Sequence, residues 1–333
     1  MEQLCGLFGK SRQAYYKSMN HNVQVFYREE LVLGLVRDVR RKTQTSRWGV
    51  RKIHTLIRGD LELLDIKMGR DKLFELLRSN CLLVSKRKRG LYTTQSHHWL
   101  RKHQNLIENM VVSRVNQLWV SDITYLRLNG EVYYLYLITD AYSQKIVGWN
   151  VSQDLKAKSA LKALKMALSY CENILPYSLV HHSDRGIQYC SQDYTALLED
   201  AKVWISMTKP ASPQENAIAE RVNGILKEEW LYDIENQKGV NAKKYIERIV
   251  LIYNEIRPHN SLGNLTPNKV HKEGFLRHDT KRVIGKKYHW KRKAGPNEIR
   301  PPVSNAIGPI DYSSTSCSSA ELASASSWYC NME

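Results

Sequence analysis

The segment WVSDITYLRL, residues 119–128, interleaves β-branched, aromatic and polar side chains, and it decides the fold of this chain. Two segments of the same kind follow it, EVYYLYLITDAY at 131–142 and QKIVGWNVS at 144–152. Such compositions favour β-strands, and the Asn129-Gly130 pair between the first two segments is typical of a tight hairpin turn. Three antiparallel strands are therefore predicted at the start of the main domain.

The chain after these strands alternates between helix and strand. Residues 155–171 carry apolar side chains at helical spacing, and YSLVHHS at 177–183 favours a fourth strand. A helix near 191–201, a fifth strand VWISM at 203–207 and a long helix from Glu215 to about Tyr232 complete the succession. The order βββαβαβα predicts a ribonuclease H-like α/β fold, with a mixed five-stranded sheet and flanking helices.

Three carboxylates occupy informative places in this scheme. Asp122 lies in the first strand, Asp184 directly follows the fourth strand, and Glu220 lies on the long helix, with 35 residues between the last two. Because the first and fourth strands of such a sheet are neighbours, we expect the acids to converge at one end. Hard oxygen ligands suit two Mg²⁺ or Mn²⁺ ions. Two such ions about 4 Å apart can drive in-line displacement at a phosphodiester.

The helix that carries Glu220 is predicted to have one polar face and one apolar face. At 100° per residue the apolar side chains lie opposite Glu220, so Glu220 is expected on an open face where Lys227 can meet a DNA phosphate. A solvated surface is the simpler interpretation for an isolated helix, and the coincidence with Asp122 and Asp184 favours the site. The polar neighbours of Glu220 are Asn216, Asn223, Gly224 and Lys227.

The net charge of +17 is unevenly distributed. Residues 1–115 hold 23 Lys+Arg against 10 Asp+Glu, residues 116–270 hold 17 of each, and residues 271–333 hold 10 against 6. A basic arm before a neutral core is typical of a polyanion-binding module joined to a catalytic domain. A merely solubilising surface is the alternative.

The basic arm contains three candidate helices, within 29–43, 47–59 and 69–80. Short helices with basic ends favour a helix-turn-helix DNA-binding region over residues 1–91, although a helical bundle with solvated lysines fits the periodicity equally well. Residues 92–116 are expected to be a linker, 117–272 the catalytic core, and 273–333 a basic and then Ser-rich tail without a fold. The candidate DNA contacts are Asn216, Lys227, Arg51, Lys52, Arg70, Lys72, Lys86, Arg87, Lys88 and Arg89.

Cysteine, histidine and hydropathy patterns narrow the class of protein. The six cysteines form no CxxC pair and no signal peptide is evident, so a reducing cytoplasm is expected. His181 and His182 lack accompanying cysteines and do not favour zinc. No apolar run is long enough for a membrane span. Tyr189, Tyr194 and Trp204 are expected in the core, with stacking on unpaired bases as the alternative.

Four segments in order resemble the integrase core of insertion sequence 3 family transposases, the product usually called OrfB. A fifth, RWGVRKIHTLI at 47–57, resembles the helix-turn-helix region that precedes this core. The four are WVSDITYL at 119–126, HHSDRGIQYCS at 181–191, SPQENAIAERVNGILKEEW at 212–230 and YNEIRPHNSLGNLTP at 253–267.

The resemblance implies a DDE transposase that cleaves and joins DNA strands at insertion-sequence ends. It implies that Asp122, Asp184 and Glu220 are the catalytic metal ligands, and that DNA ends and a target duplex are the partners. It also implies a first-reading-frame product, joined by frameshifting, as a further partner and a homo-oligomer on DNA. Where the family has Asp-Asn-Ala before the glutamate, this chain has Glu215-Asn216-Ala217, and the Ser-rich tail has no counterpart in the family.

Two functions of other classes compete with transposition. A ribonuclease H-like nuclease would use the same acids and metals but would not need the basic arm. A non-catalytic DNA-binding regulator would keep the arm but would not need three acids at this spacing. Strand transfer separates the three hypotheses, because only a transposase joins a 3′-hydroxyl end into a second duplex.

Overall fold

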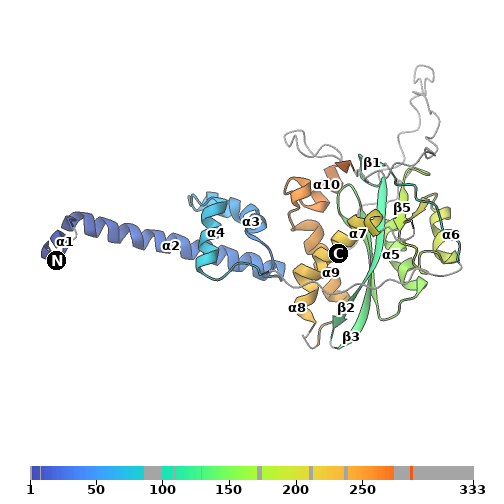
Figure 1. Ribbon diagram of the computed structural model, residues 1–333, viewed down its shortest axis with the longest axis horizontal. Helices are drawn as coiled ribbons and strands as arrows, with labels where there is room; N and C mark the ends of the chain where they lie inside the picture. Colours follow the sequence, from blue (N-terminus) through green and yellow to red (C-terminus); the bar gives the residue numbers. More distant parts are fainter. Residues whose placement is uncertain are drawn as a thin grey trace, which may run out of the picture. The chain divides into compact units, whose positions relative to one another are not determined.

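A computed structural model describes residues 2–7, 9–85, 100–108, 110–128, 130–170, 175–209, 213–235, 239–273 and 286–287 (Figure 1). The candidate contacts Lys86, Arg87, Lys88 and Arg89 lie outside these residues. So does most of the tail.

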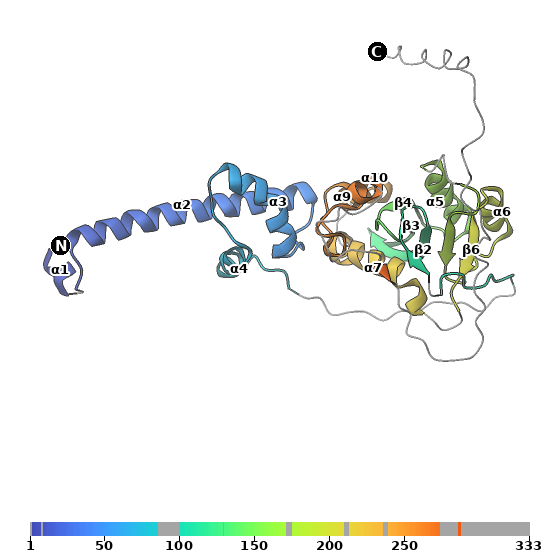
Figure 2. The same ribbon diagram turned by 90° about the horizontal axis from the view of Figure 1, so that it is seen from above.

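The N-terminal region is helical. It comprises α1 (Glu2–Leu7), α2 (Arg12–Thr43), α3 (Val50–Leu63) and α4 (Arg70–Ser79). Helices α3 and α4 lie beside the C-terminal half of α2 (Figure 2). Their small core joins Val32, Leu33 and Val36 of α2 to Ile53 of α3 and Leu73 of α4, all fully buried or nearly so. The helices expected within 29–43, 47–59 and 69–80 are therefore present.

Helix α2 is longer than the sequence analysis anticipated. We expected a helix within 29–43, whereas the structure has a single helix of 32 residues from Arg12 to Thr43. Ser11 starts it as the N-cap, its hydroxyl accepting a bond of 3.1 Å from the Ala14 N–H. The helix runs on because no Gly or Pro occurs between Arg12 and Leu33. It ends at Gln44, which adopts a left-handed conformation.

The central sheet has five strands in the order β4-β3-β2-β5-β6. Strand β2 pairs antiparallel with β3, placing Asp122 opposite Leu137, and parallel with β5, placing Ser121 opposite Ser183. The adjacency expected for the first and fourth predicted strands, which are β2 and β5, is confirmed. The strands are β2 (Leu118–Leu128), β3 (Glu131–Asp140), β4 (Ile146–Ser152), β5 (Val180–Ser183) and β6 (Trp204–Met207).

Helices cover both faces of the sheet because β3 alternates its side chains. Leu135 and Leu137 pack toward α7 (Ala217–Leu226) and α9 (Ala242–Glu255), while Tyr136 and Ile138 pack toward α5 (Ala157–Ser169) and α6 (Gln192–Asp200). On the second face β4 approaches α5 so closely that a Cβ on Gly148 would lie 2.3 Å from the Ala163 carbonyl oxygen. Only glycine fits there.

The long helix expected from Glu215 to about Tyr232 is present as a continuous series. A 3₁₀ turn, η1 (Pro213–Asn216), leads into α7, which continues through a π-helical turn, η2 (Lys227–Leu231), into α8 (Tyr232–Ile234). After α9 the chain makes the short turn η3 (Asn260–Leu262) and ends its helical part with α10 (Pro267–Glu273). The π turn rotates the residues after Leu226 relative to those before it.

Part of the interval predicted as a linker packs on the core. The Met207 N–H donates to the Gln104 carbonyl over 3.2 Å, and the Leu106 N–H donates to the Ser206 hydroxyl over 2.9 Å. Ile107 is buried. Strand β1 (Val111–Val112) pairs with β7 (Lys286–Lys287), within the tail that we expected to lack structure. Isolated apolar residues such as Ile107, too few to form a periodic pattern, account for the first difference, and backbone pairing alone makes the second.

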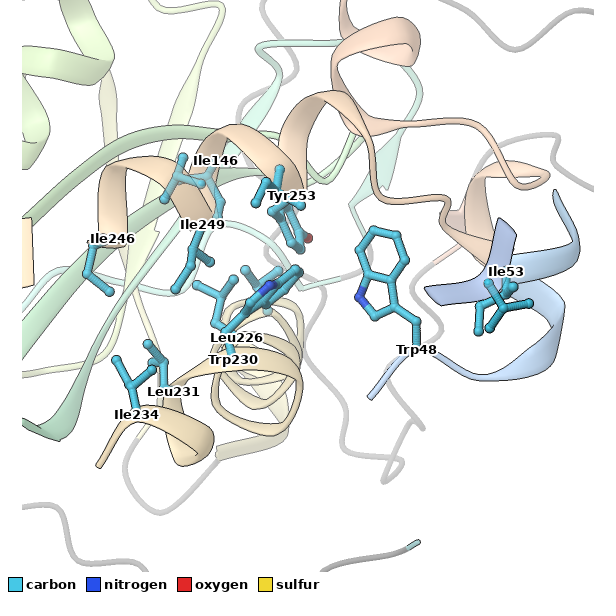
Figure 3. Packing of buried hydrophobic residues seen from close by; sticks show 14 of the residues in the cluster. Trp48, Ile53, Ile146, Leu226, Trp230, Leu231, Ile234, Ile246, Ile249 and Tyr253 are labelled. Carbon is cyan, nitrogen blue, oxygen red and sulfur yellow. The ribbon is translucent and has the colours of Figure 1, made fainter. Parts of the chain in front are cut away.

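Two tryptophans join the helical region to the core. Trp48 and Trp230 pack edge to face, with ring centroids 6.1 Å apart (Figure 3). The Trp230 indole N–H donates to the Thr43 carbonyl over 2.9 Å, and the Thr45 hydroxyl donates to the Glu229 carbonyl. Both ring systems are almost fully buried. Across the described segments, no helix has the length and apolar character needed to cross a membrane.

Candidate active site

Asp122 and Asp184 are brought together by the parallel pairing of β2 and β5. Ser121 lies opposite Ser183 in the register, so the next residue of each chain segment is one of the two acids. Both carboxylates are half-buried. The electrostatic effect of Asp184 on Asp122 shows that the two charges lie close enough to repel each other.

The Asp122 carboxylate is held from two sides. Its Oδ2 accepts a bond of 2.7 Å from the Asn223 side-chain amide, and its Oδ1 accepts one of 2.9 Å from the Ile123 N–H. Burial, followed by the charges of Asp184 and Glu220, raises the pKa of Asp122 to about 7 despite these bonds. Without a bound cation this acid therefore titrates near neutral pH.

The Asp184 carboxylate is fixed by the turn that follows β5. Its Oδ1 accepts a bond of 2.9 Å from the Gly186 N–H. A Cβ at Gly186 would lie 2.9 Å from that same oxygen, so this turn requires glycine. The Arg185 guanidinium donates to the Thr208 carbonyl over 2.6 Å and holds the turn against the end of β6.

Glu220 lies in the first turn of α7 and is exposed. Burial raises its pKa above the usual range. Two buried asparagines, one turn to either side, attach the helix to β2: the Asn216 amide donates to the Ser121 carbonyl over 3.0 Å, and Asn223 bonds Asp122. These two bonds hold the turn of α7 that carries Glu220 against β2 at Ser121 and Asp122.

The donor set fits a hard divalent cation, although the pocket is not closed. Among the residues that the structure describes, no three His, Cys, Asp or Glu side chains are as close together as a bound metal requires. Asp122 and Asp184 form the close pair, and Glu220 stands further off. All three supply only oxygen ligands, as Mg²⁺ and Mn²⁺ prefer. A cation between the first two would relieve the repulsion that raises the pKa of Asp122.

The polar face of α7 is more enclosed than the sequence analysis anticipated. We expected Lys227 and Asn216 on an open face, yet Lys227 is only 8% exposed and Asn216 only 4%. The Lys227 ammonium lies 4.4 Å from the centre of the Tyr125 ring. Burial lowers its pKa, partly offset by the charge of Asp122. The cause of the difference is that this face packs on β2 and leaves only Glu220 exposed.

The candidate contacts of the helical region fall into two groups. Arg51, Arg70 and Lys72 are exposed on α3 and α4, far along the chain from the acids. Lys52 instead forms an ion pair with Glu229 of the core. We had expected Lys52 to contact a DNA phosphate. In the structure it contacts Glu229, because α3 directs this side chain toward η2 rather than toward solvent.

Glu229 is the centre of a buried ionic cluster that the sequence analysis did not identify. It accepts two bonds from the Arg257 guanidinium, 2.7 Å from Nε and 2.6 Å from the terminal nitrogen, in addition to the Lys52 bond. Burial opposes ionisation of Glu229, but Arg257 and Lys52 hold its pKa below the ordinary value. Nothing in the sequence pattern around Glu229 or Arg257 marked the two residues as partners. The role of Asn223 was missed as well, although it is on the same helix face as Glu220.

The histidines and aromatic residues near the site have structural partners. His181 bonds the Tyr194 hydroxyl over 3.0 Å, and His182 bonds the Ser206 hydroxyl over 2.8 Å. Burial lowers their pKa values to about 3 and about 4, so both are neutral at pH 7. Tyr189 and Tyr194 are buried as expected, whereas Trp204 is 44% exposed beside Tyr177.

Comparison with known proteins identifies families and relatives that this chain resembles. Two models described as integrase core domain match residues 112–213 and 201–267. A 31 kDa protein of insertion element IS600 from Shigella sonnei is 32% identical over 269 residues, an alignment that covers 79% of this chain and 96% of that protein. Transposase InsF for insertion sequence IS3fB from Escherichia coli (strain K12) is 33% identical over 174 residues, covering 52% of this chain and 60% of InsF.

Two solved structures are similar at lower identity. The HTLV-2 integrase catalytic core domain, in complex with magnesium, is 17% identical with a TM-score of 0.39, covering 51% of this chain and 99% of that one. The catalytic core domain of BIV integrase is 18% identical with a TM-score of 0.36, covering 47% and 95%.

The five-stranded sheet and the family matches together define a class, the polynucleotidyl transferases with a ribonuclease H-like integrase core. Within that class the chain belongs to the insertion sequence 3 family of transposases. Its function is DNA transposition and integration by DDE-type chemistry.

Proposed function

We propose that Asp122, Asp184 and Glu220 are the catalytic acids of this transposase and that they hold two Mg²⁺ or Mn²⁺ ions. When bound, such ions activate the attacking oxygen and stabilise the leaving oxygen of a phosphodiester. The reaction is cleavage at insertion-sequence ends followed by joining of the 3′-hydroxyl to a target duplex. Metal dependence is typical of the integrase core family.

The repulsion between Asp122 and Asp184 carries this proposal. Burial of the carboxyl group, followed by the charge of Asp184 at the end of the neighbouring parallel strand, raises the pKa of Asp122 to about 7. Such an arrangement costs stability unless a cation occupies it. Asn223 and the Gly186 amide orient the two acids by hydrogen bonds. Glu220, exposed on the first turn of α7, completes the ligand set when its side chain turns toward the pair.

Residues outside the acids are proposed to bind DNA. Arg51, Arg70 and Lys72 offer exposed cations on the helical region, and Lys86, Arg87, Lys88 and Arg89 extend the same basic segment in sequence. Phosphate contacts of this kind position a duplex without reading its bases. Lys227 is proposed to act at the site as a cation whose charge interacts with Asp122.

The proposal also covers the partner protein, the oligomeric state and the cellular location. The first-reading-frame product, joined to this chain as a frameshift fusion, supplies recognition of the element ends. The protein works as a homo-oligomer on DNA, because two ends must be joined to one target. It acts in the bacterial cytoplasm, on nucleoid DNA.

A strand-transfer assay tests the assignment of the acids. Asp122→Asn, Asp184→Asn and Glu220→Gln should each lower joining of a 3′-hydroxyl end at least about a thousandfold, because one metal ligand supports several kcal/mol of transition-state stabilisation. Glu228→Gln is the matched control, since Glu228 is exposed two turns along the same helix series, and it should keep full activity. Full joining by any one of the three variants would remove that acid from the site.

A further inference from the structure

The N-terminal half of α2 presents an uncovered face. From Arg12 to Glu30 every residue is exposed or half-buried and none is buried. This stretch spans roughly 28 Å at the rise of an α-helix. It nevertheless carries large apolar side chains: Met19 is 51% exposed and Phe26 is 65% exposed. A helix of this length without tertiary packing is marginal in water.

Three apolar or aromatic side chains and one asparagine of this half form a line along the helix, which we call the seam. Tyr15, Met19, Asn22 and Phe26 follow one another at steps of four, three and four, the spacing of residues that face a partner helix. A shallow groove runs between their side chains, lined also by Ser18 and Val23. The next steps reach Leu33 and Val36, which are buried under α3 and α4. The seam is thus the exposed continuation of a face that packs elsewhere.

The charges at the two ends of the seam are opposite. Arg12 lies three residues before Tyr15, and Glu29 lies three residues after Phe26. In an antiparallel pair of identical helices centred between Met19 and Asn22, Arg12 of one copy lies opposite Glu29 of the other. Tyr15 lies opposite Phe26, and Met19 opposite Asn22. A parallel pair would place Arg12 against Arg12 and Glu29 against Glu29, which repels.

We infer that the seam Arg12–Tyr15–Met19–Asn22–Phe26–Glu29 binds the same seam of a second copy of this chain in antiparallel orientation. The seam has a positive charge at one end and a negative charge at the other, so two antiparallel copies pair Arg12 with Glu29 twice. An unrelated apolar helix would not need these charges, and their presence favours a second copy of this chain as the partner. The inference rests on the proposed oligomeric action on DNA and names the surface that would join two copies, away from the acids.

Sedimentation velocity of the full chain, without DNA or metal, tests the interface. The unaltered chain should associate in a concentration-dependent manner. Met19→Asp and Phe26→Asp should each weaken association at least tenfold, whereas Gln24→Asp, on the opposite side of the same helix, should not. Circular dichroism of each variant shows whether the helical region has kept its fold.

Charge exchange tests the orientation. Arg12→Glu and Glu29→Arg should each weaken association, and the double variant R12E/E29R should restore it, because the opposed pairs re-form with reversed sign. Lys17→Glu makes the same charge change off the seam and should have no effect. A monomeric parent chain, or association that survives Met19→Asp, would overturn the inference, as would a double variant no better than the singles.

Failure of the interface and failure of the proposed chemistry are separable. Asp184→Asn should abolish joining while leaving sedimentation unchanged, because the acid is not on α2. If the parent chain is monomeric but still joins strands, the interface is wrong and the seam serves another partner, such as the first-reading-frame product. If it associates through the seam but never joins strands, only the assignment of the chemistry falls.

Discussion

Asp122 carries the clearest consequence at the scale of a residue. Its folded-state pKa of about 7 lies above the ordinary value of an unfolded aspartate. Such a group stabilises the fold fully below the unfolded pKa and loses that contribution as the pH rises through the folded pKa. The metal-free protein should therefore become less stable between about pH 4 and pH 7 because of this residue, the reverse of the usual aspartate.

Asp122→Asn should remove that dependence. At pH 8 in EDTA we expect the variant to be more stable than the parent by roughly 1–2 kcal/mol, well under the full shift because the carboxylate is partly hydrated. At pH 4 the two should be equal. Urea unfolding at both pH values measures this. A variant equally destabilised at both would mean that the Asn223 bond, not the charge repulsion, dominates.

Lys227 provides a second test at this scale. Lys227→Met keeps the volume of the side chain but removes the cation beside Asp122, so joining should fall at least about tenfold, or 1.4 kcal/mol. Melting temperature should change little, since the lost cation–π contact with Tyr125 is offset by relief of a buried charge. Lys227→Arg should recover much of the activity. A large loss of stability with normal joining would make Lys227 a packing residue.

At the scale of elements, the cluster of Lys52, Glu229 and Arg257 connects α3, η2 and the end of α9. Breaking a buried pair leaves one charge without its partner, which typically costs about 3–5 kcal/mol. Glu229→Leu should show that loss because it strands Arg257, whose side chain is 6% exposed. Lys52→Met should cost less, because the Lys52 side chain is 23% exposed.

The double variant Glu229→Leu with Arg257→Met should recover a good part of this loss, since both charges are then gone. Equilibrium unfolding in urea of the two singles and the double gives the coupling. Losses that simply add would show that the two side chains stabilise the fold independently, in contradiction to the bidentate contact.

The elements themselves were largely predictable from sequence, and their tertiary partners were not. The β-branched and aromatic composition of the strands and the helical spacing of apolar residues within 155–171 predicted the sheet and its helices, because both signals depend on local periodicity. The continuous α2 was missed because residues 12–28 are mostly polar, and the few apolar side chains among them are too sparse to indicate a buried helix face. The burial of Lys227 and the pairing of Lys52 with Glu229 were missed because a cation looks the same in sequence whether it meets phosphate or a buried acid.

At the scale of the whole molecule, the basic arm should dominate the salt dependence of DNA binding. Exposed cations on α3 and α4 release counterions from phosphates, each contributing about 0.9 to the slope of log K against log salt. Replacing Arg51, Arg70 and Lys72 together with Gln should reduce the slope by about 2 to 3. Lys158, Lys162 and Lys165 of α5 form the matched control. Equal reductions in both triple variants would show a diffuse electrostatic surface.

The adjacency of Asp122 and Asp184 was the part of the site that the sequence predicted best. The fold order puts the first and fourth strands side by side, so Asp122 and Asp184 had to meet. The contribution of Asn223 could not be predicted in the same way, because an asparagine one turn after a glutamate has many possible partners. Its bond to Asp122 depends on the rotation of α7 on β2, which only the folded chain sets.

The parallel pairing of β2 with β5 also has a consequence for biosynthesis. Ser183 follows Ser121 by 62 positions, and Glu220 comes 36 positions after Asp184. A nascent chain therefore leaves the ribosome with its acids in succession, and distant strands must close on each other before any two acids can meet, a slow kind of folding event. The three acids can therefore come together only after translation has passed α7.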